Sequence, residues 1–247
     1  KEIAIDLETN DPGLITSGSG SVVGRGHIAG IAVAVEGWSG YYPIQHENGG
    51  NIDKKLVFGW LQEILNQENT TFIFHNAMYD VCWLRAAGLI IKGKIVDTMI
   101  AASLVNENRF KFDLNSLAKE YVGIGKDENV LRIAAKDFGV DPKAEMWRMP
   151  AMYVGEYAER DAEVTLKLWQ RLSIELHNEE LMDIFNLETK LFPCLVDMRF
   201  KGVRVDLEHA AKLKKNLIIR EDKILKNIKD LVGFDIEINA ARSIAKG

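Results

Sequence analysis

The amino-acid sequence predicts an α/β domain in which a mixed β-sheet is flanked by helices. Short apolar runs alternate with longer segments whose apolar residues recur at steps of three and four, which indicates strands and amphipathic helices. The first strand-like runs are joined by short links, and this favours antiparallel pairing. A later run at 71–75 is continuously apolar at its centre, which is typical of strands covered on both faces in a mixed or parallel sheet.

The first half of the chain is predicted to contain all strands of this sheet. Strands are predicted at 3–9, 28–35, 40–44, 71–75 and 94–97. Helices are predicted at 54–67, 76–87, 98–105 and 114–121. The Gly- and Ser-rich stretch 10–26 lacks the glycine spacing of a phosphate-binding loop, so it predicts a flexible connection. Asn76 is expected to cap its helix, and Gly88 to end it.

The second half is predicted to be mainly helical. Helices are predicted near 130–138, from Pro150 onward, at 184–200 and after Asp206. A short strand is predicted at 203–205, and Asn239 is expected to cap a further helix.

These segments divide the chain into two predicted domains, residues 1–183 and residues 184–247. Two helices with a short strand do not close a core of their own, so the second part is expected to be the opening of a domain that is cut off at Gly247. The chain also begins directly on a strand, which suggests a trimmed N-terminus.

Composition excludes several classes of protein. The net charge of -5 does not indicate a nucleic-acid binder. It does not exclude one either, because local basic residues can offset an acidic pocket. Cys82 and Cys194 are far apart, which implies neither a metal spacing nor a disulfide framework, and a reducing compartment is expected. No apolar run approaches the length of a membrane span, and no signal peptide is visible.

Two carboxylates lie inside the first predicted strand. Asp6 and Glu8 are two residues apart, so they point to the same face as near neighbours. Like charges at the end of a buried strand repel each other and resist desolvation unless a cation holds them. The pair therefore predicts half of a metal site. Taken alone, an edge strand with two solvated acids is the favoured alternative.

Two later segments supply the other candidate groups. Asp80 lies one turn into the helix that follows the strand at 71–75. Tyr157 and Asp161 are four residues apart in the long helix, so their side chains lie together on an otherwise apolar face. A buried hydrogen bond between the tyrosine and the aspartate would, alone, explain this pair as well as catalysis does.

Taken in this order, three stretches resemble the motifs of the 3′–5′ proofreading exonucleases that carry an Asp-Glu-Asp-Asp set and a tyrosine. The stretches are Ile5-Asp6-Leu7-Glu8-Thr9, His75-Asn76-Ala77-Met78-Tyr79-Asp80 and Tyr157-Ala158-Glu159-Arg160-Asp161-Ala162. The resemblance covers about residues 1–180 and implies a ribonuclease H-like fold.

The C-terminal part resembles the start of the polymerase domain of family A DNA polymerases. In that family a helix ends in a Gly-Val-x-Val-Asp turn before the long thumb helices, and residues 202–206 and 239–242 fit this pattern. The resemblance therefore implies an exonuclease domain followed by a partial, all-α, thumb-like segment, from a larger bacterial, phage or organellar enzyme. Palm and fingers motifs are absent, so this chain alone is not expected to polymerise.

The resemblance also implies catalytic roles. It assigns Asp6, Glu8 and Asp161 to the tighter of two divalent ions, Mg²⁺ or Mn²⁺, both of which prefer oxygen ligands. Asp6 also serves the second ion, with Asp80 acting largely through water. Two such ions about 4 Å apart activate a water and stabilise the leaving 3′ oxygen. Tyr157 orients the attacking water and need not be the base, since its unperturbed pKa is about 10.

Substrate contacts are implied for a further set of residues. The residues that the resemblance suggests for substrate binding are Thr9, Asn76 and Arg109. Phe110 and Phe112 are suited to stacking on unpaired bases, with packing under their loop as an equal alternative. The family also uses an apolar wedge shortly after the first motif, and residues 12–15 occupy that place here.

The expected partners are a single-stranded or frayed 3′ end of DNA and the rest of the polymerase chain, with no membrane and no indicated homo-oligomer. The expected location is the cytoplasm of a bacterium or phage-infected host, or an organelle matrix. One alternative is a free-standing 3′–5′ exoribonuclease of the ribonuclease D type, which shares the catalytic positions. A second is an inactive domain that binds primer ends, and a third is an α/β domain whose acids are incidental.

Overall fold

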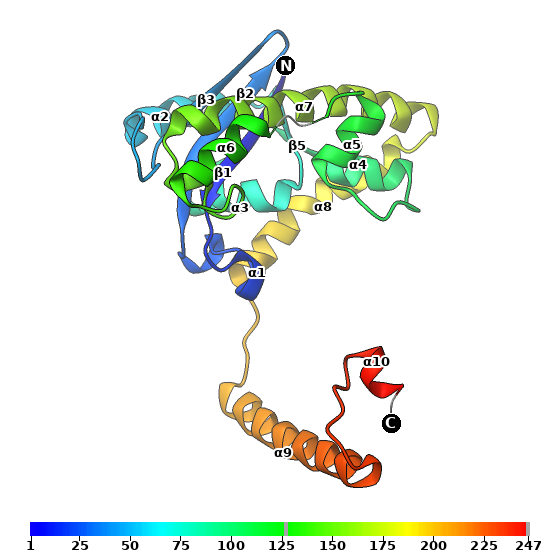
Figure 1. Cartoon of the computed structure of the whole chain (residues 1–247). Helices are drawn as coiled ribbons and strands as arrows, with labels where there is room; N and C mark the ends of the chain where they lie inside the picture. Colours follow the sequence, from blue (N-terminus) through cyan, green and yellow to red (C-terminus); the bar gives the residue numbers. More distant parts are fainter. Residues whose placement is uncertain (126–127, 246–247) are drawn as a thin grey trace. The chain divides into compact units, whose positions relative to one another are not determined.

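The structure is a computed structural model that describes residues 1–125 and 128–245. The chain divides into two compact units, Lys1–Phe200 and Lys201–Gly247. The first unit contains a five-stranded sheet with helices on both faces (Figure 1). No helix in the described part of the chain is long and apolar enough to cross a bilayer.

The sheet is mixed, as predicted. Its strands are β1 (Glu2–Asn10), β2 (His27–Val35), β3 (Trp38–Pro43), β4 (Thr71–Phe74) and β5 (Lys94–Asp97), in the spatial order β3-β2-β1-β4-β5. Strands β1, β2 and β3 pair antiparallel, whereas β4 pairs parallel with β1 and β5. Pairing of β1 with β2 continues to Asn10, but pairing with β4 stops at Ala4. Beyond Ala4, therefore, one edge of β1 is open to groups from outside the sheet.

The two faces of the sheet carry different side chains, because residues alternate along each strand. On one face, Ile3, Ile5 and Leu7 pack in the core that contains residues of α2 (Lys54–Leu65), α3 (Ala77–Ala86) and α8 (Met182–Lys201). On the other face, Ala4 and Ala32 pack in the core that contains residues of α4 (Thr98–Val105), α5 (Leu114–Tyr121) and α7 (Ala151–Asn178). Helix α7 contacts β1, β2, β3 and β4, so it lies across this second face.

A small third core holds the start of α7. It is formed by α6 (Asn129–Phe138), by the 3₁₀ turn η2 (Met146–Arg148) and by Val154 of α7 itself. The predicted helix near 130–138 is thereby confirmed. The stretch 10–26, predicted to be a loop, contains two short helical turns, α1 (Leu14–Ser17) and η1 (Ser21–Val23).

Asn76 occupies the N-cap position of α3, as predicted, but its side chain does not cap the helix. Asn76 precedes α3 with φ 63° and ψ 53°, and its side chain makes no cap hydrogen bond. A residue in this left-handed conformation directs its side chain differently from the usual extended cap residue. The Asp97 carboxylate binds the first amide groups of the helix instead.

The second unit consists of α9 (Leu207–Val232) and α10 (Ala241–Ile244). Asp206 begins α9 as predicted, and its carboxylate accepts the His209 N–H at 2.9 Å. The strand predicted at 203–205 is wrong, because a strand needs a pairing partner and all five strands in the described residues belong to the sheet of the first unit. The Asn239 cap is also wrong, since α10 begins after Ala240.

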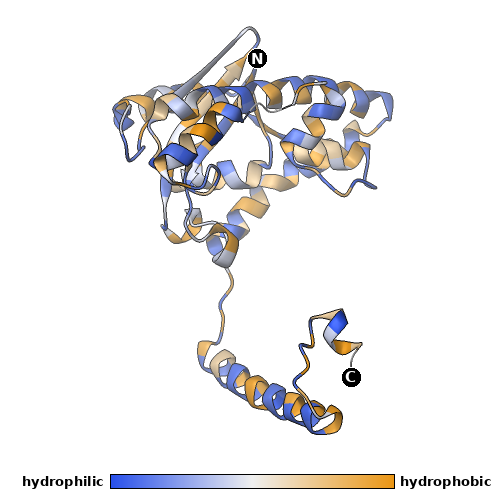
Figure 2. Ribbon diagram, in the orientation of Figure 1, coloured by the Kyte–Doolittle hydropathy of each residue, from blue (hydrophilic) through white to orange (hydrophobic). Residues whose placement is uncertain are grey.

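Helix α9 is amphipathic, and none of its residues, all of them described, is buried. Apolar residues recur along its length (Figure 2). Helix α8, by contrast, buries Phe185, Phe192 and Val196 in the cores of the first unit. The domain boundary at 183/184 stays a prediction, and the compact unit itself extends to Phe200.

Candidate active site

Asp6 and Glu8 lie on the face of β1 that α7 covers. Strand alternation puts them on the same side as Ala4, whereas Leu7 points into the opposite core. Their partners across β2 are small, since Asp6 pairs with Ala32 and Glu8 pairs with Gly30. The strand register then shifts between Glu8 and Thr9, which is a β-bulge. The sequence thus leaves space beside both carboxylates.

Asp80 reaches the open edge of β1 from the first turn of α3. The Leu7 N–H has no β4 partner at this level, and it donates to Asp80 Oδ1 at 3.1 Å. The side chain of Asp80 is only 4% exposed. Burial raises the pKa of Asp80, and the negative charge of Asp6 raises it further. Asp80 and Asp6 are therefore close enough to repel each other strongly.

Tyr157 and Asp161 approach the same carboxylates from α7. They lie one helical turn apart, and the buried Asp161 carboxylate accepts a hydrogen bond from the Tyr157 hydroxyl. Burial raises the pKa of Tyr157 above its ordinary value, and the charges of Asp161, Glu8 and Asp6 raise it further, in that order. These shifts mean that Tyr157 remains protonated at neutral pH and that its hydroxyl lies within the field of the β1 acids.

Asp97 holds the start of α3 in place, a role that the sequence did not predict. Its Oδ1 accepts the Asn76 N–H at 3.0 Å and the Met99 N–H at 2.8 Å, and its Oδ2 accepts the Ala77 N–H at 2.8 Å. One buried carboxylate thus joins the N-termini of α3 and α4. Because Asp80 lies in the first turn of α3, Asp97 fixes the backbone that carries it.

Tyr41 and His46 also adjoin the site and were missed by sequence reasoning. Burial raises the pKa of Tyr41, and the charges of Glu8 and Asp6 raise it further. The Tyr41 hydroxyl is 2.6 Å from His46 Nε2. The small residues Gly30 and Ala32 are the only sequence signal for this contact, since they leave space between β3 and the acids. That space becomes evident only once the register of β1, β2 and β3 is known.

Thr9 and Asn76, predicted to bind substrate, flank these acids in the chain. Thr9 is hydrogen-bonded to the Tyr79 hydroxyl at 2.6 Å, and that hydroxyl in turn donates to Asp11 Oδ2 at 3.2 Å. Asn76 precedes α3, where Asp97 binds its backbone N–H. In the 12–15 stretch, Ile15 is almost fully exposed.

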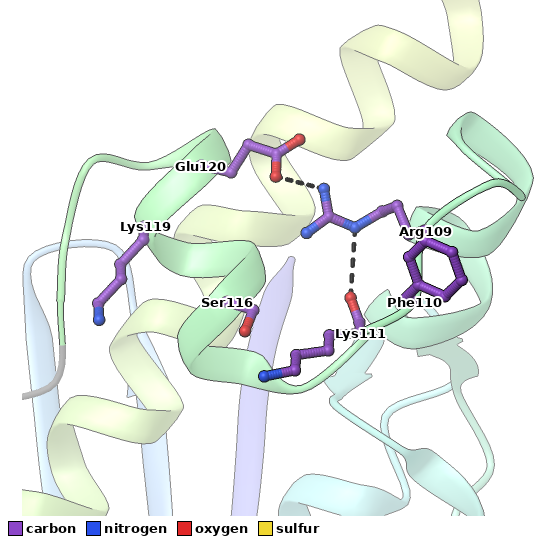
Figure 3. Close-up of a pocket in the computed structure, with 6 residues that line it drawn as sticks. All are labelled: Arg109, Phe110, Lys111, Ser116, Lys119 and Glu120. Carbon is purple, nitrogen blue, oxygen red and sulfur yellow. Dashed lines mark hydrogen bonds and ion pairs between the residues drawn. The ribbon is translucent and has the colours of Figure 1, made fainter.

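Arg109 lies in a different pocket, on the loop between α4 and α5 (Figure 3). The pocket is lined by Arg109, Phe110, Lys111, Ser116, Lys119 and Glu120. The Arg109 guanidinium is paired with Glu120, and Arg109 Nε donates to the Lys111 carbonyl at 3.3 Å. Phe112 packs against the α4–α5–α7 core, as the packing alternative predicted, whereas Phe110 is fully exposed and its stacking role stays a prediction.

The four candidate ligands suit a hard divalent cation in their chemistry. All are carboxylates, and oxygen donors are what Mg²⁺ and Mn²⁺ prefer. Burial and, after it, the negative charge of Asp6 raise the pKa of Asp80, and a bound cation would offset both effects. Over residues 1–125 and 128–245, however, no three His, Cys, Asp or Glu side chains are gathered in an arrangement that would hold an ion.

A family model for the 3′–5′ exonuclease domain of family A DNA polymerases matches residues 1–177. The chain belongs to this family. The predicted family and the predicted class of enzyme, an exonuclease domain of a DNA polymerase, are thus confirmed. This family A exonuclease chain is 34% identical to the DNA-directed DNA polymerase of Pseudomonas phage M6 over 244 residues, which cover 96% of the chain and 36% of that polymerase.

Other relatives agree with this assignment. The DNA polymerase I of Pseudomonas aeruginosa is 25% identical over 89% of this chain and 24% of its own length. The chain spans about a third of the length of the phage polymerases that it matches.

Solved structures confirm the ribonuclease H-like fold of this family A exonuclease chain. The POL domain of Pol1 from M. smegmatis, in complex with DNA primer-template and dNTP, aligns with a TM-score of 0.64 at 16% identity, over 99% of this chain and 36% of that one. The Brucella melitensis NrnC with bound Mg²⁺ aligns with a TM-score of 0.58 at 19% identity, over 83% and 89% of the two chains.

Proposed function

We propose that this exonuclease domain removes nucleotides from the 3′ ends of DNA, as the proofreading part of a longer family A polymerase chain. The observation that carries the proposal is the electrostatic influence that acids from three separate segments exert on one another and on Tyr157. Asp6 affects the pKa of Asp80 and, together with Asp161, that of Tyr157. Such crowding is costly for a fold, and it is explained when the acids serve a cation-dependent reaction on a phosphodiester.

In this proposal the carboxylates of Asp6, Glu8, Asp80 and Asp161 hold two divalent ions, Mg²⁺ or Mn²⁺. When bound, the ions supply a reactive water at neutral pH and stabilise the charge that develops on the leaving 3′ oxygen. The chain's own contribution is to keep the carboxylates apart and oriented. The Leu7 N–H fixes Asp80 Oδ1, and the β1 backbone fixes the spacing of Asp6 and Glu8.

Tyr157 is proposed to orient the attacking water through its hydroxyl. Its raised pKa supports this role over that of a general base, because the hydroxyl keeps its proton at neutral pH. Asp161, which accepts a hydrogen bond from that hydroxyl, holds its direction.

Thr9, Asn76 and Arg109 are proposed to bind the DNA strand. Arg109 offers a guanidinium that already binds the planar carboxylate of Glu120, and a tetrahedral phosphate group likewise presents anionic oxygens to its N–H donors. Phe110 stands fully exposed beside it, and aromatic rings of this kind stack on unpaired bases without regard to sequence. Lys111 and Lys119 line the same pocket and add positive charge.

The test is a gel assay of the protein on single-stranded DNA labelled at its 3′ or its 5′ end. Reactions contain Mg²⁺, Mn²⁺ or a chelator, and Asp6→Ala is run beside the wild type. We expect a metal-dependent ladder that shortens from the 3′ end and is absent with Asp6→Ala.

Glu2→Gln is the matched control. Glu2 lies on the same face of β1 as Asp6, and its Oε1 accepts a hydrogen bond from Trp169 Nε1 at 2.9 Å, which glutamine can retain. Glu2→Gln should therefore cleave like the wild type. Metal-independent cleavage, or shortening from the 5′ end, would contradict the proposed mechanism. No cleavage by the wild type, with binding of DNA retained, would favour the primer-end-binding alternative.

A further inference from the structure

A tyrosine from the edge strand β3 extends across β2 toward the candidate acids. Tyr41 pairs with Ala32 on β2, and Ala32 pairs with Asp6 on β1, so the three lie in one row across the sheet. The Tyr41 side chain leans over Gly30, where a Cβ atom would lie 2.0 Å from the tyrosine hydroxyl oxygen. Gly30 itself pairs with Glu8. The glycine therefore makes room for a tyrosine hydroxyl beside the acid pair.

The proton of the Tyr41 hydroxyl has a fixed direction. His46 Nδ1 is 2.9 Å from the Met149 carbonyl oxygen, and a carbonyl only accepts, so Nδ1 carries the proton. His46 Nε2 is then the acceptor for the Tyr41 hydroxyl, which lies 2.6 Å away. His46 is buried. Its Nε2 binds Tyr41 of β3, and its Nδ1 binds Met149, which lies two residues before α7.

A second contact joins Tyr41 to α7 at the level of the catalytic pair. The Tyr41 backbone N–H donates to Glu159 Oε1 at 3.0 Å, and Glu159 lies between Tyr157 and Asp161 in the chain. The aromatic ring of Tyr41 also packs against the two cores that α7 shares with the sheet and with α6. Tyr41 thus contacts α7 at the level of Tyr157 and Asp161, through residues on the other flank of the helix.

We propose that Tyr41 and His46 are positioning residues that set the place of Tyr157 and Asp161 over Asp6 and Glu8. The inference rests on the proposed function and deepens it. Residues 47 and 49 also bond through their backbones to residues 147 and 151, so the start of α7 is held by several contacts. The Tyr41–His46 bond is the one among them that extends to the acid face of the sheet.

Tyr41→Phe tests the proposal, because it removes the hydroxyl and keeps the ring. Displacement of catalytic groups by about 1 Å can lower activity about 100-fold, and we expect kcat on a single-stranded oligonucleotide to fall about 10- to 100-fold. KM should stay within about twofold, because Tyr41 makes no proposed contact with DNA, and a fall in kcat alone indicates misplaced reacting groups.

Ser39→Ala is the matched control. Ser39 is two residues before Tyr41 on β3, and its hydroxyl donates to Glu163 Oε1 at 2.6 Å, four residues after Glu159 on α7. This variant therefore removes a hydrogen bond between the same strand and the same helix, further from the acids. We expect its kcat to match the wild type. An equal fall in kcat for Ser39→Ala and Tyr41→Phe would overturn the proposal, since general packing of β3 on α7 would explain both.

Variants of His46 test whether the two residues act as one unit. His46→Gln offers one donor and one acceptor, whereas His46→Leu offers neither. We expect His46→Gln to retain more of the wild-type kcat than His46→Leu. Combining Tyr41→Phe with His46→Leu should lower kcat little further than the larger single effect, because both remove the same bond. Fully additive losses would overturn the proposed link.

Amide hydrogen exchange of residues 151–162, measured without metal or DNA, separates this inference from the proposed function. We expect faster exchange in Tyr41→Phe than in the wild type and in Ser39→Ala. If the wild type cleaves no 3′ end, the proposed function fails, and exchange alone decides whether Tyr41 holds α7. Unchanged exchange together with unchanged kcat in Tyr41→Phe would overturn the positioning role.

Discussion

The candidate acid site and the Arg109 pocket differ in how their charges are held. In the acid site, Asp80 and Asp161 are 4% and 6% exposed, and they are fixed by backbone, helix and neighbouring hydroxyl groups. In the pocket, an exposed phenylalanine and two lysines stand on and beside a loop, next to the ion pair of Arg109 and Glu120. Buried, fixed charges lose little conformational entropy during the reaction. Exposed charges on mobile side chains can adjust to a bound DNA strand. The difference teaches that changes at the first region should alter kcat and changes at the second should alter KM.

The strongest test of this division is Asp161→Asn. The variant keeps the size of the side chain but removes the charge proposed to bind metal, so kcat should fall at least about 1000-fold, equivalent to about 4 kcal/mol of transition-state stabilisation. Steady-state cleavage of a 3′-labelled oligonucleotide measures this. Glu163→Gln, one half-exposed acid two residues along α7, is the control and should cleave normally. If the loss of activity appeared only as a rise in KM, Asp161 would not be among the reacting groups.

Tyr157→Phe should have the next largest effect. Loss of a group that orients the attacking water is expected to lower kcat about 100-fold, while KM and metal affinity stay near their wild-type values. Single-turnover cleavage and calorimetric Mn²⁺ titration measure the two quantities. Wild-type rates in this variant would leave Tyr157 as a buried hydrogen-bond partner of Asp161 without a role in the reaction.

Phe110→Ala and Phe112→Ala sharpen the comparison from the pocket side. Phe110 is exposed, so its removal should raise KM for single-stranded DNA about tenfold, as expected for loss of one stacked base worth about 1–3 kcal/mol, and should leave Tm unchanged. Phe112 packs on the core, so its removal should lower the free energy of unfolding by about 2 kcal/mol. Steady-state cleavage, which gives KM, and thermal melting, which gives Tm, distinguish the two variants. Equal KM values for Phe110→Ala and the wild type would exclude the stacking role.

The smallest expected effect is on stability and depends on pH. Burial and the charge of Asp6 raise the pKa of Asp80, and such a carboxyl contributes stability that is complete below its ordinary pKa of about 3.9 and is lost as pH rises through the raised value. Without metal, Asp80→Asn should therefore be more stable than the wild type at pH 8, and the gap should narrow toward pH 4. A difference of 1 kcal/mol shifts Tm by about 2–4 °C in a chain of this size.

Melting curves at both pH values, with and without Mg²⁺, check this expectation. A Tm gap that stays constant between pH 4 and pH 8 would show that Asp80 is not repelled by its neighbours.

Most of the fold could be predicted from the sequence because its elements are strongly periodic. The strand at 94–97 and the helices at 98–105 and 114–121 were predicted with the bounds that the structure has. The order of the acid-bearing segments also identified the family, since each acid lies at a recognisable place in a strand or helix.

The parts that could not be predicted depend on contacts between segments that are distant in the sequence. Asp97 was expected only to end a strand, but its carboxylate binds amides at the start of another helix, 21 and 20 positions earlier. Tyr41 was an ordinary residue of a predicted strand until the register with β2 placed it over Gly30. Asn76 is the N-cap residue as predicted, but its side chain does not cap the helix, because propensity does not show that a distant carboxylate already binds the helix start.

The left-handed backbone at Asn76 has a consequence for how its function should be measured. Alanine pays roughly 1–2 kcal/mol to adopt such a conformation, whereas glycine adopts it without steric cost. Asn76→Ala would therefore combine the loss of the side-chain amide with a distortion of the turn that leads into α3 and Asp80. It would overstate the contribution of the Asn76 side chain to substrate binding. Asn76→Gly separates the two, because it removes the amide while the chain keeps its path.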